Sequence, residues 1–127
     1  MKKFLLLICA SLMIFAAKAQ SDGDAVVKAL KSGSADQIAG YFDSFIDLKL
    51  PEKDEVKSMG KNQASIALKS FFNESGVKGF DLSSQREMSG TMYIAGKLQN
   101  NGKGNGISLR LKKQGDKLLI ISIRIND

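Results

Sequence analysis

The sequence contains no histidine and no tryptophan, and it has a single cysteine, Cys9, and a single proline, Pro51. The absence of histidine excludes Ser–His and Cys–His catalysis and every metal site built on imidazole. Chemistry is left to carboxylates, lysines, arginines, serines and the two tyrosines, Tyr41 and Tyr93. An enzyme of this composition would have to use a carboxylate or a tyrosine as its acid or base. We therefore assign no catalytic residue, no metal site and no cofactor.

Residues 1–19 read as a secretion signal. Lys2 and Lys3 precede a run from Phe4 to Ala17 that is apolar apart from Ser11, and Ala17-Lys18-Ala19 has the small–x–small pattern that signal peptidases cleave. A transmembrane helix needs about 20 apolar residues, and this run is shorter. Retention as an uncleaved anchor is the main alternative. Lipidation of Cys9 is disfavoured, because bulky Ile8 precedes it where a small residue is required.

Cleavage after Ala19 changes the composition of the chain. It leaves residues 20–127, a single domain of 108 residues that is long enough for one modest core. It also removes the only cysteine, so the exported domain has no disulfide and no thiolate ligand. The basic residues fall from 19 to 16 against 13 acidic ones, and the net charge falls from +6 to +3. This weak basicity argues against a nucleic-acid partner. The cleaved signal predicts a periplasmic or secreted protein with no membrane anchor after processing.

Helical patterns dominate the first half of the mature chain. Val26, Val27 and Leu30 form a short apolar stripe that Gly33 ends. Ser34 to Gln37 have capping-box spacing, and Ile38, Tyr41 and Phe42 follow at helical intervals. The clearest helix begins at Lys61 and ends before Gly76. Its apolar stripe has the spacing i, i+3, i+4, i+7, i+8, and comprises Ala64, Ala67, Leu68, Phe71 and Phe72.

Strand patterns make up most of the rest. Ile46, Leu48 and Leu50 alternate with polar residues in a strand that Pro51 ends, and residues 52–60 are polar and predicted to form a loop. After Gly76 the alternation predicts three or four consecutive antiparallel strands. In the last strand, one face is predicted to hold Leu119, Ile121, Ile123 and Ile125. Asn101-Gly102, Asn105-Gly106 and Gly115-Asp116 mark two hairpin connections. Helices followed by a strand, a helix and a meander predict an α+β fold with helices packed on a curved antiparallel sheet.

This order of elements resembles the nuclear-transport-factor-2-like fold of the cystatin-like superfamily. More closely, the chain resembles a family of exported Bacteroidetes proteins, domain-of-unknown-function family 4783. The resemblance rests on short stretches spread over the mature chain: Ala29-Leu30-Lys31-Ser32-Gly33, Tyr41-Phe42-Asp43, Lys61-Asn62-Gln63-Ala64, Phe71-Phe72 and Tyr93-Ile94-Ala95-Gly96-Lys97-Leu98. It implies the fold and carries no activity with it.

Aromatic side chains are the candidate binding residues. Folds of this type hold a pocket between the helices and the concave sheet, which aromatic residues could line, although ordinary core packing explains the same pattern. The candidates are Tyr41, Phe42, Phe45, Phe71, Phe72 and Tyr93. A small acid–base enzyme, of the isomerase or dehydratase type, would combine one tyrosine with Asp43, Asp47 or Glu87.

The last strands carry many basic residues: Lys97, Arg110, Lys112, Lys113, Lys117 and Arg124. They form either a surface for an anionic partner or simply the solvated face of an amphipathic sheet. Three functions follow from these patterns. The first is a non-catalytic exported domain that binds a small apolar ligand or a protein partner in the cell envelope. The second is the acid–base enzyme. The third is a structural component of the envelope that forms a homodimer across the sheet face.

Overall fold

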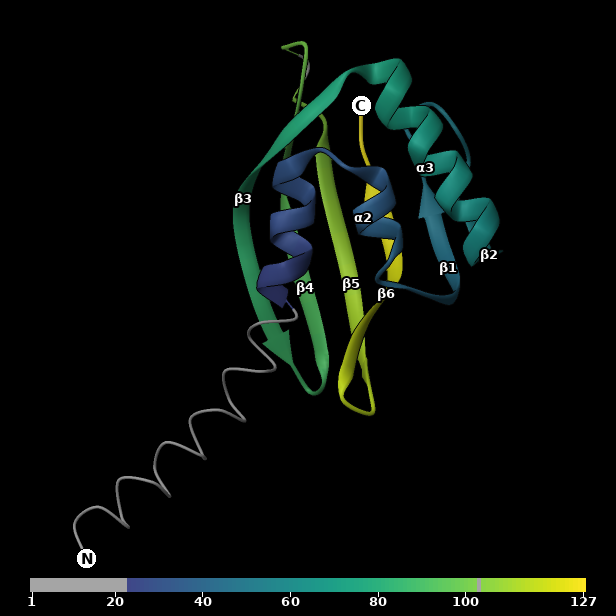
Figure 1. The fold of residues 1–127 in the computed structure, drawn as a ribbon, viewed down its shortest axis with the longest axis vertical. Coiled ribbons are helices and arrows are strands. Elements are labelled where there is room, and N and C mark those ends of the chain that lie inside the picture. The colour runs from purple at the N-terminus through teal and green to yellow at the C-terminus, as the bar shows by residue number, and fades with distance from the viewer. Residues whose placement is uncertain (1–22, 103) are drawn as a thin grey trace, which may run out of the picture.

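The computed structural model describes residues 23–102 and 104–127; the segment read as a secretion signal lies outside them. Helices cover one face of a six-stranded sheet (Figure 1). The chain is helical over residues 23–32. The later elements are α2 (Ala35–Ala39), β1 (Phe42–Lys49), β2 (Val56–Gly60), α3 (Lys61–Ser75), β3 (Val77–Met88), β4 (Thr91–Asn100), β5 (Gly106–Gln114) and β6 (Lys117–Ile125). The predicted α+β arrangement of helices on a curved sheet is confirmed.

The sheet has the strand order β2-β1-β6-β5-β4-β3. Strands β3 to β6 form the predicted antiparallel meander. β1, however, pairs with β6 in parallel, so the sheet is mixed rather than purely antiparallel. The local alternation of β1 could not show this, because its partner lies at the other end of the chain.

Helix α3 matches its prediction. It spans Lys61–Ser75 and ends at Gly76, which adopts a left-handed conformation with φ of 65° and donates its backbone N–H to the Phe72 carbonyl. Ala64, Leu68 and Phe72 are buried along its inner face. The helix contacts α2, β1 and β2, so it closes the side of the sheet that the other helices leave open (Figure 1).

Helix α2 is shorter than its periodicity predicts. Ser34 caps it as expected, since its hydroxyl accepts a hydrogen bond from the Gln37 backbone N–H at 3.2 Å. The helix then ends at Ala39, and Phe42 begins β1. The prediction that Tyr41 and Phe42 continue the helix was wrong because Ile38 and Phe42 are both buried, and a spacing of four residues fits a helix even when the chain turns between them.

Residues 52–60 do not form a loop throughout, as predicted. Val56–Gly60 form β2, an edge strand that pairs with β1. Its side chains are exposed or only partly buried, so it lacks the apolar alternation that marks a strand. Ser58 has a φ of 53°, and its backbone N–H donates to the Asp47 carboxylate at 2.9 Å. This bond replaces a ladder bond where the register of β1 and β2 shifts.

The last strand changes faces in its middle. Arg110 pairs with Ser122 and Leu111 with Ile120, so Ile121 is an extra residue in a bulge. Leu118 and Ile120 are therefore buried on the same side as Ile123 and Ile125, and Leu119 and Ile121 are only partly buried. The predicted continuous face from Leu119 to Ile125 was wrong because a bulge shifts the two-residue period by one.

Candidate functional site

The structure places the six candidate aromatic residues at separate locations. Phe42 and Phe72 belong to the core, with 2% and 4% of their surfaces exposed. Phe71 packs edge-on against Phe72, with ring centroids 6.3 Å apart. Phe45 and Tyr93 are 64% and 39% exposed, and both alternate with residues that point toward the helices. The six residues therefore do not line one common pocket.

Apolar side chains fill the space between helices and sheet where the fold predicts a pocket. Leu30 and Ile38 enter it from the helical layer, and Leu68 enters from α3. Ile94 and Leu109 meet them from the sheet, and all five side chains have 1% or less of their surface exposed. This packing explains why Phe42 and Phe72 act as core residues.

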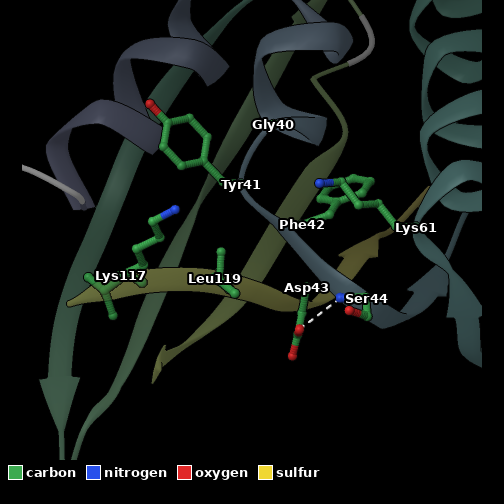
Figure 2. Close-up of a pocket in the computed structure, with 9 residues that line it drawn as sticks. Gly40, Tyr41, Phe42, Asp43, Ser44, Lys61, Lys117 and Leu119 are labelled. Carbon is green, nitrogen blue, oxygen red and sulfur yellow. Dashed lines mark hydrogen bonds between the residues drawn. The ribbon is translucent and has the colours of Figure 1, made fainter. Parts of the chain in front are cut away.

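Tyr41 and Phe42 do line a hollow, at the point where β1 separates from β6 (Figure 2). Phe42 pairs with Ile120, but the next paired residues are Asp47 and Ser122. Four residues of β1 thus face a single residue of β6. A hollow of about 480 Å³ lies beside the Phe42–Ile120 pair, lined by β1 up to Ser44 and by the β6 residues that precede Ile120, and we refer to it as the β1–β6 hollow. Its lining residues are Gly40, Tyr41, Phe42, Asp43, Ser44, Lys61, Lys117, Leu118 and Leu119.

The β1–β6 hollow combines an apolar wall with two cationic side chains. Tyr41 and Leu119, both partly exposed, supply most of the accessible apolar surface, because Phe42 and Leu118 are almost fully buried. Lys117 extends from β6 toward Tyr41, and Lys61 extends from the start of α3 toward Phe42 (Figure 2). Within residues 23–102 and 104–127, ion pairs form only between Lys69 and Asp36 and between Arg124 and Glu55, so both lysines of the hollow are unpaired.

The one carboxylate of the hollow is already engaged. Asp43 accepts a hydrogen bond from the Ser44 backbone N–H at 2.7 Å and another from the Gln114 side chain at 2.6 Å. It points away from both lysines and from Tyr41 (Figure 2). The hollow therefore presents positive charge beside apolar surface, an arrangement that suits a ligand with an apolar body and an anionic group.

Phe71 and Tyr93 lie at two other hollows. Phe71 lines a groove of about 700 Å³ between α3 and the turn after β1, where the ionisable neighbours Glu52, Glu74 and Asp127 outnumber Lys53. Tyr93 lines a basin of about 470 Å³ on the sheet face that the helices leave uncovered. The groove is larger than the β1–β6 hollow, but its acidic rim opposes an anion and its position depends on a turn rather than on a separation of strands.

Sequence reasoning did not find the two lysines of the hollow as a pair. Lys117 belongs to the predicted basic surface, and Lys61 belongs to the start of the predicted helix and to one of the stretches that carry the family resemblance. They are 56 positions apart in the chain, and the pairing of β1 with both β2 and β6 places them at the same hollow. No local pattern carries that information.

The described residues offer little for metal or acid–base chemistry. Among them, no group of three acidic, histidine or cysteine side chains lies close enough to hold a metal ion. Their buried polar residues are Asn100 and Asn105, so each described carboxylate is at least partly exposed to water. None of the described helices is both long and apolar enough to span a membrane.

Comparison with known proteins identifies the family. The family model described as a domain of unknown function, DUF4783, matches residues 23–126. A crystal structure of a DUF4783 protein from Bacteroides ovatus is 25% identical, with a TM-score of 0.75 over 81% of this chain and 92% of that one. A second, from Bacteroides uniformis, is 21% identical, with a TM-score of 0.74 over 82% and 94%.

The fold extends beyond the family. An NTF-2 like protein of unknown function from Shewanella oneidensis is 14% identical, with a TM-score of 0.60 over 88% of this chain and 98% of that one. No curated protein matches the sequence. The family match spans nearly all the described residues, and the relatives share the arrangement of helices on a curved sheet. The chain belongs to the family of domains of unknown function DUF4783 and has a nuclear-transport-factor-2-like fold.

Proposed function

We propose that the protein is an exported, non-catalytic binding domain of the cell envelope, and that its β1–β6 hollow binds a small ligand with an apolar body and one anionic group. The observation that carries the proposal is the hollow at the start of the β1–β6 pairing, around which partly exposed apolar side chains and two unpaired lysines lie. The volume of about 480 Å³ lies within the range of about 300–1,000 Å³ typical of small-molecule sites.

The two kinds of wall have different roles. Contact of an apolar ligand body with Tyr41 and Leu119, which are partly exposed, would add affinity, because the hydrophobic effect scales with the apolar area removed from water. The ammonium groups of Lys61 and Lys117 would orient the anionic group. Both lysines are exposed in the free protein, so each interaction adds a modest amount.

Tyr41 and Asp43 are the tyrosine and carboxylate that an acid–base enzyme would use in this hollow. Their arrangement favours binding over catalysis. The Asp43 carboxylate points away from Tyr41, and two hydrogen bonds hold it in that orientation. A general base must lie within hydrogen-bond reach of the proton that it removes.

Export rests on residues 1–19, with their basic start, apolar run and small–x–small end. An exported domain without cysteine or histidine meets its ligand outside the cytoplasm, either in the periplasm or beyond it. The homodimer across the sheet face remains a prediction.

Isothermal titration calorimetry with three probes tests the proposal. Octanoate has both an apolar body and a carboxylate, octanol lacks the charge, and acetate lacks the body. We expect octanoate to bind more tightly than either of the others. Replacement of both lysines (Lys61→Gln with Lys117→Gln) should weaken octanoate binding about tenfold, with little effect on octanol.

Lys78→Gln is the matched control, because Lys78 is an exposed, unpaired lysine of the described residues that lies outside the hollow. It should leave octanoate binding unchanged. The proposal fails if octanoate does not bind at millimolar concentration. It also fails if the double variant and the control weaken binding equally, since a general effect of charge would then explain the result.

A further inference from the structure

Four strands place an arginine, a tyrosine, a second arginine and a serine in one row on the uncovered face of the sheet. Arg86 of β3 pairs with Tyr93 of β4, Tyr93 pairs with Arg110 of β5, and Arg110 pairs with Ser122 of β6. Residues directly opposite each other in neighbouring strands share a face, with Cβ atoms about 5 Å apart. Tyr93 is therefore flanked by two guanidinium groups.

The row borders the basin of about 470 Å³ that Tyr93 lines. Small side chains occupy its floor, because Ala95 pairs with Ser108 in the next row and Ser122 lies beside them. Tyr93 and Arg110 stand at its border. The basin thus has an aromatic side chain at one side, hydroxyl groups on its floor and a guanidinium group at its border.

Some charged side chains around the basin have partners within the protein, and others have none. Arg124 pairs with Glu55 at 3.6 Å, and the Asp47 carboxylate accepts the Ser58 backbone N–H at 2.9 Å. Arg110 and Lys57, which line the basin, form no ion pair with any other described residue, and neither does Arg86 at the end of the row. Since the side chains of Arg110 and Lys57 are exposed, their positive charge is available to a partner from solution.

We infer that this basin binds a sugar unit that carries a carboxylate, as found in an acidic polysaccharide. The Arg110 guanidinium would hold the carboxylate through two parallel hydrogen bonds, which a planar fork of donors favours. The apolar face of the sugar ring would lie against Tyr93. Ser108, Ser122 and Asp47 supply hydroxyl and carboxylate groups for the sugar hydroxyls.

The mixture of groups favours a saccharide over other anions. A single-stranded nucleic acid binds through several aromatic platforms along a basic groove, and this basin has one tyrosine. An acidic peptide offers carboxylates, but its side chains carry no hydroxyl groups to form hydrogen bonds with the serine hydroxyls of the floor. The inference does not depend on the β1–β6 hollow, because the basin shares no lining residue with it.

Calorimetry of the mature protein with trigalacturonate at low salt tests the inference. Maltotriose is the uncharged comparison and triglutamate is the peptide with multiple carboxylates. We expect trigalacturonate to bind at least tenfold more tightly than either. Arg110→Gln and Tyr93→Ala should each weaken trigalacturonate binding about tenfold. Thermal unfolding would confirm that both variants fold, as expected for exposed side chains.

Lys112→Gln removes a positive charge from the same face and the same strand, two residues beyond Arg110 and outside the basin. It should change the affinity less than twofold. The inference is overturned if Lys112→Gln and Arg110→Gln weaken binding equally, if triglutamate binds as tightly as trigalacturonate, or if trigalacturonate does not bind. It is also overturned if light scattering shows a homodimer that Tyr93→Ala dissociates, because the partner subunit would then cover the basin.

Discussion

Asn100 and Asn105 form a buried side-chain pair, in which the Asn100 amide donates a hydrogen bond to the side-chain oxygen of Asn105. Asn100 ends β4 and Asn105 directly precedes β5, so the pair closes the connection between these strands. Asn105 also donates to the backbone carbonyl of Asn126 at 2.7 Å. The pair thus joins the hairpin to the end of β6, and it comprises the buried polar residues of the described chain.

Asn105→Ala should lower the free energy of unfolding by about 2 kcal/mol. The Asn100 amide would lose its partner in a buried site, and the Asn126 carbonyl would lose a donor in a partly buried one. Urea unfolding followed by circular dichroism would measure the change. Asn126→Ala is the control, because its side chain is exposed and its carbonyl remains; a change above about 0.5 kcal/mol in the control would contradict this explanation.

Gly96 is buried in β4, next to Phe80 of β3, and a side chain at this position has no space. A Cβ atom added to Gly96 would overlap the Asp81 carbonyl oxygen and the Phe80 ring. Gly96→Ala should therefore lower the free energy of unfolding by about 3 kcal/mol, at the upper end of the range for overpacked cores.

Gly60→Ala is the matched control for Gly96→Ala. Gly60 has a φ of −60°, and no atom lies within 4 Å of the added Cβ. Gly60 is the N-cap of α3, where alanine is less favourable than glycine, so this variant should lose at most about 1 kcal/mol, well below the loss at Gly96. If both variants lost the same free energy of unfolding, close packing against Phe80 would not explain the effect of Gly96→Ala.

Two aromatic residues of β1 should respond very differently to truncation. Phe42 is almost fully buried and Phe45 is 64% exposed. Phe42→Ala should cost about 3–5 kcal/mol through lost burial and the remaining cavity, and Phe45→Ala should cost less than about 0.5 kcal/mol. Chemical denaturation of both variants measures this difference. A large loss from Phe45→Ala would mean that another surface covers it in solution.

The ion pair between Lys69 of α3 and Asp36 of α2 should contribute little. Its charged atoms are 3.6 Å apart, and the two side chains are 58% and 71% exposed. A double-mutant cycle with Lys69→Ala and Asp36→Ala should give a coupling energy below about 1 kcal/mol, lowered further by salt. A larger coupling would indicate that the pair helps to dock α2 on α3.

Cleavage of the signal should produce a mature protein that begins at Gln20. Intact mass spectrometry of the exported protein would measure this directly. Replacement of both small residues (Ala17→Leu with Ala19→Leu) should block processing, whereas Ala10→Leu, within the apolar run, should not. An exported protein that retains residues 1–19 would instead support the uncleaved anchor.

Local patterns predicted the helices and strands whose apolar periodicity is visible within their own residues. The stripe from Ala64 to Phe72 identified α3. Gly76 marked its end, because the chain leaves the helix there through a left-handed backbone conformation, which glycine adopts without strain. The strands of the meander followed from two-residue alternation. β2 was not predicted, because an edge strand buries few side chains and so shows no apolar alternation. The prediction of a helix through Phe42 was wrong, because the spacing of four residues from Ile38 fits a continuous helix as well as a helix followed by a turn and a strand.

The candidate site depended on relationships that no local pattern contains. Of the six aromatic candidates, the sequence alone could not separate buried Phe42 from exposed Phe45, since both belong to the same strand. Lys61 and Lys117 line the same hollow because β1 pairs in parallel with β6 and in antiparallel with β2, which directly precedes α3. Arg86, Tyr93 and Arg110 align because the register of three strands places them opposite one another.

The sequence by itself determined the fold class, most of the elements and the absence of histidine chemistry, because composition and short-range periodicity act within a few residues. Only the tertiary structure decided which aromatic residues belong to the core, where the sheet opens and which charges remain unpaired. Those properties arise from pairing between strands that are distant in the sequence, and from the bulges that shift this pairing. Such contacts form only when the chain has folded, so no short segment contains them.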